Sequence, residues 1–176
     1  MSQVVKYKLE EAHKLYLPNV LLLQPFQQTF GGSIVRHYNS FSIRYKREKF
    51  KLSDGEVIAL DWYCGEPLAH VHMGYENEDI KPIALFVADV REDIQSPDLK
   101  LMIPMAFESG YRCVVLNYRG CGNMKLKYPR LVSLYDVQDT EEVVNYLKSK
   151  TNAFKCLVAI GFGFGGNQII NYLIKI

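Results

Sequence analysis

Three apolar runs, each followed by a helical pattern, constrain the fold of this 176-residue chain more than any other feature. The runs are IALFVA (83–88), YRCVVLNY (111–118) and KCLVAIG (155–161). None of them alternates between polar and apolar residues, so both faces of each strand are expected to be buried. A parallel sheet with helices on its faces and right-handed crossovers supplies that environment. We therefore predict an α/β fold with a mostly parallel sheet.

The helix between the first two runs carries start and stop signals. Ser96 is predicted to be its N-cap and Pro97 its first-turn residue, and Gly110 is predicted to close it. Pro104 lies inside this helix and is predicted to kink it, because proline removes a backbone hydrogen bond.

The two later helices are predicted from the same kinds of signal. One starts near Asp139, whose carboxylate is expected to cap it while the Glu142 side chain reaches back. The other is NQIINYLIKI, predicted to start at Asn167 and reaching the last residue without a glycine cap or polar exit.

The first third of the chain is less regular. Residues 5–17 predict an amphipathic helix that ends before Pro18. Residues 18–48 are predicted as loops because of Pro25, Gly31 and Gly32. The basic run 44–49 within them is predicted to be an exposed strand or face. Residues 49–62 predict an antiparallel hairpin that turns at Ser53-Asp54-Gly55, and a surface loop follows at 64–82. We therefore expect a helical or irregular extension at 1–48 and the N-terminal part of an α/β domain at 49–176.

The composition excludes several classes of function. Twenty-one basic and 19 acidic residues give a net charge of +2 without a basic face, so nucleic acid is not an expected partner. The four cysteines form no CxxC pair, which favours a reduced, cytoplasmic setting. The apolar run 20–23 is far shorter than the roughly 20 residues of a membrane span, and no signal peptide is expected. The histidines His13, His37, His70 and His72 have no metal-ligand spacing, so neither a metal nor a cofactor is expected.

The glycine-rich turn after the third run is the motif most directly linked to chemistry. It reads Gly161-Phe162-Gly163-Phe164-Gly165-Gly166, where a strand meets a helix. A dinucleotide fingerprint G-x-G-x-x-G fits the spacing, but it normally opens the first unit and is followed about 20 residues later by an acidic residue, which is absent here. A nucleophile elbow of the G-x-S-x-G type and a plain tight turn that needs glycine both remain open.

The ordered motifs from about Lys49 to the end resemble the α/β-hydrolase family. They are F-x-L-x-D-G-x-x-x-x-L-D-W, GYRCVVLNYRGCG, Pro129-Arg130, DTEEVVNYL and IGFGFGGNQIINYL. The resemblance is to the subfamily of YheT-like esterases and animal lipase-like and phospholipase-like α/β-hydrolase domain proteins. It implies a partial α/β-hydrolase fold, a place in lipid metabolism, and an acyl lipid or ester-like small molecule as ligand.

The chain departs from this family at the residues that catalyse. The family's nucleophilic serine corresponds to Gly163, which has no side chain that could attack a carbonyl. The fold's acid and histidine come after the elbow, and no such residues follow here. The loop after the first run, residues 86–91, has no glycine for an oxyanion hole and carries a carboxylate, so the Phe164 N–H is the residual oxyanion donor. Cys121 is a weak alternative nucleophile, because no histidine is placed to activate its thiol.

These departures lead to three hypotheses about function. The first is a truncated, catalytically inactive member of the lipase and esterase family, a pseudoenzyme with Gly161 to Gly165 as its elbow and no catalytic residue. The second is a lipid-binding or partner-dependent half-domain, in which a protein covers the apolar edge at 157–160. The third is a serine-type ester hydrolase that is active only in a longer isoform.

Overall fold

The computed structural model describes residues 24–38, 43–65, 81–90, 92, 94–150 and 156–175. For residues 35–38 it describes the backbone only. The chain forms two compact units, Met1–Asn39 and Ser40–Ile176. The predicted helix at 5–17 and most of the predicted loop at 64–82 lie outside the described residues.

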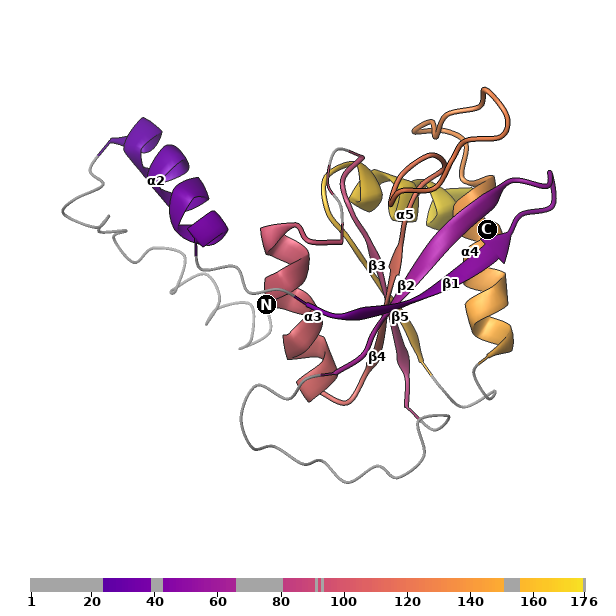
Figure 1. The fold of residues 1–176 in the computed structure, drawn as a ribbon, viewed down its shortest axis with the longest axis horizontal. Coiled ribbons are helices and arrows are strands. Elements are labelled where there is room, and N and C mark those ends of the chain that lie inside the picture. Colours follow the sequence, from indigo (N-terminus) through magenta and orange to yellow (C-terminus); the bar gives the residue numbers. More distant parts are fainter. Residues whose placement is uncertain are drawn as a thin grey trace, which may run out of the picture. The chain divides into compact units, whose positions relative to one another are not determined.

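The second unit is built on a five-stranded sheet with strand order β1-β2-β4-β3-β5 (Figure 1). The three strands predicted as parallel pair in parallel, β3 with β4 and β3 with β5. The hairpin is also confirmed, since β1 pairs with β2 antiparallel across the turn at Asp54-Gly55, and β2 pairs with β4 antiparallel. The strands are β1 (Tyr45–Lys51), β2 (Val57–Tyr63), β3 (Ile83–Val87), β4 (Arg112–Leu116) and β5 (Leu157–Gly161).

Two hydrophobic cores lie on opposite faces of this sheet, and the central strand β3 contributes alternate side chains to them. Ile83, Leu85 and Val87 pack into the core covered by α4 (Gln138–Ser149) and α5 (Phe164–Lys175). Ala84 and Phe86 pack into the core covered by α3 (Pro97–Glu108). Figure 1 shows α3 on one side of the sheet and α4 and α5 on the other. Burial on both faces explains why the strand sequences do not alternate.

Helix α3 begins and ends as the sequence predicts. The Ser96 hydroxyl accepts a hydrogen bond from the Leu99 N–H (3.4 Å), and Gly110 follows the helix with a positive φ of 92°. The Tyr111 N–H donates to the Ala106 carbonyl, which satisfies one of the free carbonyls of the last turn. Pro104 lies inside the helix and is buried, and the helix continues to Glu108.

The predicted cap of α4 is wrong. The helix begins at Gln138 after Val137, and no side chain makes an N-cap hydrogen bond. The Asp139 carboxylate instead binds the Arg119 guanidinium, and the Glu142 carboxylate accepts hydrogen bonds from the N–H and hydroxyl of Ser53. Charge-assisted bonds to a buried guanidinium outcompete the weaker bonds of a helix cap.

The prediction of loops at 18–48 is wrong for the described part of the first unit, which holds helix α2 (Pro25–Tyr38). Pro25 is its first residue, where a fixed φ favours helix and no N–H is needed. The Phe26 and Phe30 rings, four residues apart, stack with centroids 5.9 Å apart. These local contacts offset the low helix propensity of Gly31 and Gly32. The basic run 44–49 is predicted to be an exposed strand or face. Strand β1 begins at Tyr45, so most of this run is a strand.

Candidate functional site

The glycine-rich turn forms a tight strand-to-helix elbow at the end of β5. Strand β5 ends at Gly161 and α5 begins at Phe164, so the predicted helix start at Asn167 is three residues too late. Gly163 lies between them with a positive φ of 50°. The elbow is held to the neighbouring strand because the Phe162 N–H donates to the Val87 carbonyl (3.0 Å). This is the backbone shape that a nucleophile elbow requires.

The outer glycines of the elbow are required by close approach of the backbone. A Cβ atom on Gly165 would lie 2.1 Å from the Val87 carbonyl oxygen, and one on Gly161 would lie 2.5 Å from the Gly166 nitrogen. Real Cβ atoms do not approach backbone this closely, so both positions admit only glycine without displacement of β3, β5 or α5. Both interpretations of the motif, a plain tight turn and a nucleophile elbow, therefore account for Gly161 and Gly165.

The middle glycine faces a side chain from another strand. Asp89 follows β3, and its Oδ2 lies 2.3 Å from the position that a Cβ on Gly163 would occupy. Its other oxygen, Oδ1, accepts a hydrogen bond from the Val90 N–H (2.6 Å). The Asp89 carboxylate thus fills the space that a side chain at 163 would need, and it engages a backbone N–H of the loop in which the oxyanion donors of the fold are expected.

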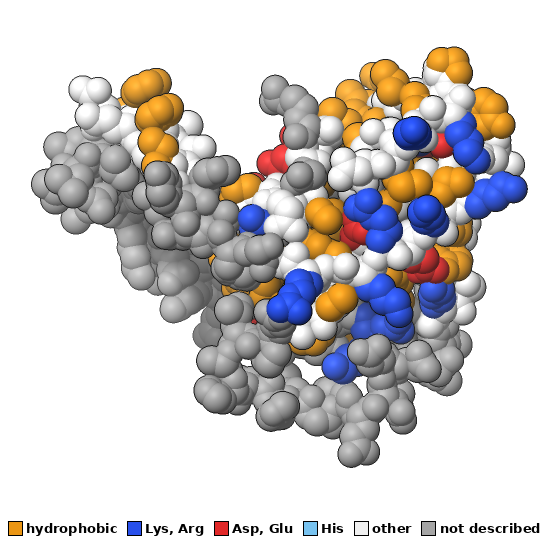
Figure 2. Space-filling view, in the orientation of Figure 1, with side chains coloured by type: hydrophobic (Ala, Val, Ile, Leu, Met, Phe, Trp, Pro, Cys, Tyr) orange, Lys and Arg blue, Asp and Glu red, His pale blue; other side chains and the backbone are white. Residues whose placement is uncertain are grey.

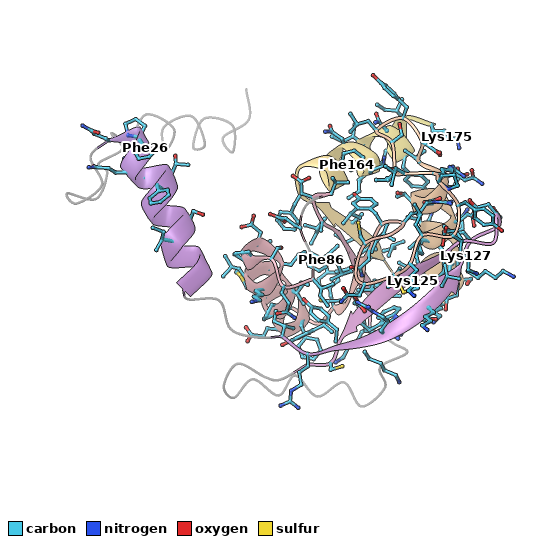
Figure 3. All side chains as sticks on the ribbon, turned by 45° about the horizontal axis from the view of Figure 1, so that its top comes forward. Phe26, Phe86, Lys125, Lys127, Phe164 and Lys175 are labelled. Carbon is cyan, nitrogen blue, oxygen red and sulfur yellow. The ribbon has the colours of Figure 1, made fainter. Side chains whose placement is uncertain are left out.

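Aromatic side chains surround this pair of residues and are used for packing. The Tyr118 hydroxyl donates to the Ala88 carbonyl (3.2 Å), and its ring meets the Phe164 ring edge-on at 5.5 Å. Phe164 packs against the core under α4 and α5, and Phe162 packs against the core under α3. Figure 3 labels Phe164 at the start of α5 and Phe86 within the sheet. The rings of Phe162 and Phe164 therefore pack into the two cores.

The remaining candidate groups near the elbow are poorly suited to nucleophilic chemistry. Burial raises the pKa of Tyr118, and the charges of Asp89 and Cys121 raise it further, so the phenol stays protonated. Burial also raises the pKa of the Cys121 thiol, which disfavours the thiolate that attacks carbonyls. Away from the elbow, at the beginning of β4, burial raises the pKa of Cys113 to about 12.

No group of three histidine, cysteine, aspartate or glutamate side chains that could hold a metal occurs among the described residues. His13, His70 and His72 lie outside them, and His37 lies in α2 with its side chain not described. Within the same residues, no helix is both long and apolar enough to cross a bilayer.

An ion-pair network beside the elbow edge of the sheet was not predicted from the sequence. The Arg119 side chain is 1% exposed, binds both oxygens of Asp139 (2.5 and 2.6 Å), and donates to Asp54 at the hairpin turn (2.5 Å). Arg130 joins the same Asp54 (3.3 Å) and also binds Asp136. Hydrogen bonds from Arg119 lower the pKa of Asp54, and those from Arg130 lower the pKa of Asp136.

A buried carboxylate completes this network, which we call the Arg119 network. Glu56 is 1% exposed and accepts hydrogen bonds from its neighbour Val57 (3.0 Å) and from the N–H groups of Lys127 (2.9 Å) and Tyr128 (3.2 Å). The bond from Val57, followed by those from Lys127 and Tyr128, lowers the pKa of Glu56. The network ties the hairpin turn to the loop between β4 and α4, and thus shapes the sheet edge where the elbow lies.

Comparison with known proteins gives relatives in sequence and in structure, although no family model matches the chain. Phospholipase ABHD3 of Mus musculus is 32% identical over 134 residues, which are 76% of this chain and 31% of that protein. Monoacylglycerol lipase ABHD2 of Homo sapiens is 32% identical over 131 residues, which are 73% of this chain and 29% of that protein. The chain therefore spans less than a third of the length of these relatives.

Solved structures agree with the fold. The Pyrococcus furiosus esterase Pf2001 superposes with a TM-score of 0.57 at 17% identity, over 76% of this chain and 48% of the esterase. This likeness confirms the predicted partial α/β-hydrolase fold.

Proposed function

The chain belongs to the α/β-hydrolase family with ABHD-like animal members, and we propose that it does not cleave esters by the serine route of that fold but acts as a binding module. The observation that carries this proposal is the Asp89 carboxylate 2.3 Å from the Cβ position of Gly163. Gly163 has no side chain to carry a hydroxyl nucleophile, and the Asp89 carboxylate would have to move before one could be accommodated. Any lipid or ester would then be bound without being cut.

The charge of Asp89 supports the same proposal. Acyl transfer places a developing negative charge beside the elbow, and hydrolases stabilise it with backbone N–H donors. Here the Val90 N–H already donates to the Asp89 carboxylate. A second negative charge at this place would be repelled by the first, so the Phe164 N–H alone is a poor oxyanion hole.

Two activity measurements test the proposal on the purified chain. We expect no labelling by a fluorophosphonate probe and no hydrolysis of p-nitrophenyl butyrate above the buffer rate. Gly163→Ser is expected to stay inactive as well, because the new hydroxyl lies beside the Asp89 carboxylate, whose negative charge disfavours the oxyanion that follows attack. Labelling of the unsubstituted chain at a serine would overturn the proposal.

The contact between Asp89 and Gly163 has its own prediction, measured by urea denaturation. Gly163→Ser is expected to lower the free energy of unfolding by about 2 kcal/mol, because serine at φ 50° is strained and Asp89 must move. In an Asp89→Gly background the same substitution should cost about 1 kcal/mol less, since only the strain remains. Equal costs in both backgrounds would show that the carboxylate does not occupy this space in solution.

A second candidate, a partner-dependent module, is favoured by the free edge of β5. Among the described residues β5 pairs with β3 alone, and it carries no charged side chain. Helix α5 beside it exposes Ile170, Leu173 and Ile174 by 56, 59 and 77%. An uncharged edge next to an apolar helix face is the kind of surface that accepts another strand.

The alternation of backbone groups along β5 allows a test of this candidate. The N–H of Phe162 and the C=O of Cys156 point towards β3. Because successive residues of a strand point their backbone groups to opposite sides, the N–H of Ala159 points away from β3. Ala159→Pro should therefore abolish strand addition while keeping the bonds to β3, and Ala159→Val should not. If light scattering finds the same monomeric mass for the unsubstituted chain and both variants, alone and with a candidate partner, the edge is not an interface.

A further inference from the structure

The sheet carries a second feature at the edge opposite the elbow, a hollow of about 650 Å³. It is lined from the beginning of β1 and β4 and from the end of β2, which runs antiparallel to β4. The elbow lies at the carboxyl end of β5, whereas β3 and β4 begin at the hollow. The hollow is therefore separate from the site described above, and its volume suits a small organic ligand.

Positive charge dominates the lining. Five basic side chains and one acidic side chain line the hollow: Lys46, Arg47, Lys81, Arg112, Lys150 and Glu48. Arg47 makes a two-point ion pair with Asp61 (2.7 Å for each bond), and Lys150 binds Glu48 (2.9 and 3.2 Å). Lys46 and Lys81 have no carboxylate partner among the described residues. Figure 2 shows many Lys and Arg side chains, with fewer Asp and Glu, on the face of this unit turned to the viewer.

Aromatic rings hold these cations in place. The Arg112 guanidinium lies 5.0 Å and the Lys150 ammonium 5.6 Å from the centroid of the Trp62 ring, and Lys81 lies 5.5 Å from that of Phe107. The Trp62 indole N–H donates to Glu48 (2.8 Å), which fixes the plane of the ring. The cations attract an anion, and the rings beside them provide a flat apolar surface for its organic part.

We propose that this hollow binds an organic phosphate monoester whose aromatic or acyl body lies against Trp62 and Phe107. A phosphate carries close to two negative charges at neutral pH and offers three strong acceptor oxygens, which suits the ammonium groups of Lys46 and Lys81 at the same hollow. A guanidinium and lysine ammonium groups are the donors that bind such oxygens. The same group occurs on soluble metabolites and on phosphatidic acid, so the phosphate monoester is the chemistry common to both sources.

The chain supplies its own reporter for the test, because Trp62 is its one tryptophan. Phenyl phosphate is expected to change the Trp62 emission saturably, inorganic phosphate more weakly, and benzyl alcohol not at all. Raising the salt concentration should weaken the binding, since the cations are partly exposed. Absence of a saturable change in Trp62 emission with phenyl phosphate up to about 10 mM would overturn the proposal.

A matched pair of variants links the response to the hollow. Lys46→Ala/Lys81→Ala should weaken phenyl phosphate binding about tenfold or more, because two of the facing charges are lost. Lys125→Ala/Lys127→Ala removes the same charge from the loop after β4 (Figure 3) and should leave the affinity unchanged. Equal loss in both double variants would show a general charge effect and would contradict the proposed site.

Vesicles distinguish the two sources of the phosphate. Phosphatidylcholine vesicles with and without phosphatidic acid are sedimented with the protein. Binding of phenyl phosphate together with the phosphatidic acid vesicles, both lost in Lys46→Ala/Lys81→Ala, assigns the hollow to a lipid headgroup. Binding of phenyl phosphate alone assigns it to a soluble compound, and vesicle binding without any phenyl phosphate response contradicts the proposal. None of these outcomes depends on whether the elbow is catalytic.

Discussion

An Arg119→Met variant is expected to lose about 3 kcal/mol of the free energy of unfolding. Arg119 is 1% exposed and is the shared partner of Asp54 and Asp139. Methionine fills much of the same volume, but it leaves Asp139 without its guanidinium partner and Asp54 with only the longer contact to Arg130. The hairpin turn and the beginning of α4 would lose their common contact, so both are expected to loosen together.

Urea denaturation followed by circular dichroism measures this loss, with Arg130→Met as the matched control. Arg130 binds Asp54 and Asp136 in the same network, but its side chain is 36% exposed. Exposed ion pairs contribute between about 0 and 1 kcal/mol, so the control should stay close to the unsubstituted protein. If the two variants are equally stable, the burial of Arg119 does not govern the stability of this edge.

The second large effect is expected at Gly165. Gly165→Ala should lower the free energy of unfolding by about 3 kcal/mol, because the new Cβ would lie 2.1 Å from the Val87 carbonyl oxygen. Relief of this overlap requires α5 to move away from β3, which would also displace the elbow. The melting temperature should fall by roughly 10 °C for a unit of this size.

Gly166→Ala is the control for this prediction, since it makes the same chemical change one residue later in α5. Its Cβ would lie 3.4 Å from the Gly161 carbonyl oxygen, an ordinary contact. Alanine is the better helix former by about 1 kcal/mol, so this variant should be as stable as the unsubstituted protein or slightly more so. A similar loss in both variants would point to a general intolerance of α5 rather than to close packing on β3.

Much of the fold could be predicted from the sequence because its signals are local. The continuous apolar runs predict β3, β4 and β5, and Ser96, Pro97 and Gly110 mark the two ends of α3. The elbow glycines were also placed correctly at the end of β5. In each case the residues that determine the structure lie within a few positions of one another.

The errors arise where a distant residue decides. Asp139 has the sequence context of a helix cap, but Arg119, 20 positions earlier, binds its carboxylate. Helix α2 is not predicted because Gly31 and Gly32 have low helix propensity, whereas stacking of the Phe26 and Phe30 rings favours the helix.

The contact of Asp89 with Gly163 joins the loop after β3 to the turn after β5, so the spacing of residues along the sequence does not predict it. The basic hollow is not predicted either, because its five cations come from four separate stretches of the sequence.

The proximity of Asp89 to Gly163 also couples the two positions. The nearest atom to a Cβ on Gly163 is Oδ2 of the Asp89 carboxylate, and the other oxygen of that carboxylate accepts the Val90 N–H. A side chain at 163 therefore acts on the loop after β3 as well as on its own turn. The two positions are expected to be epistatic, so that the residues tolerated at 163 depend on the residue at 89.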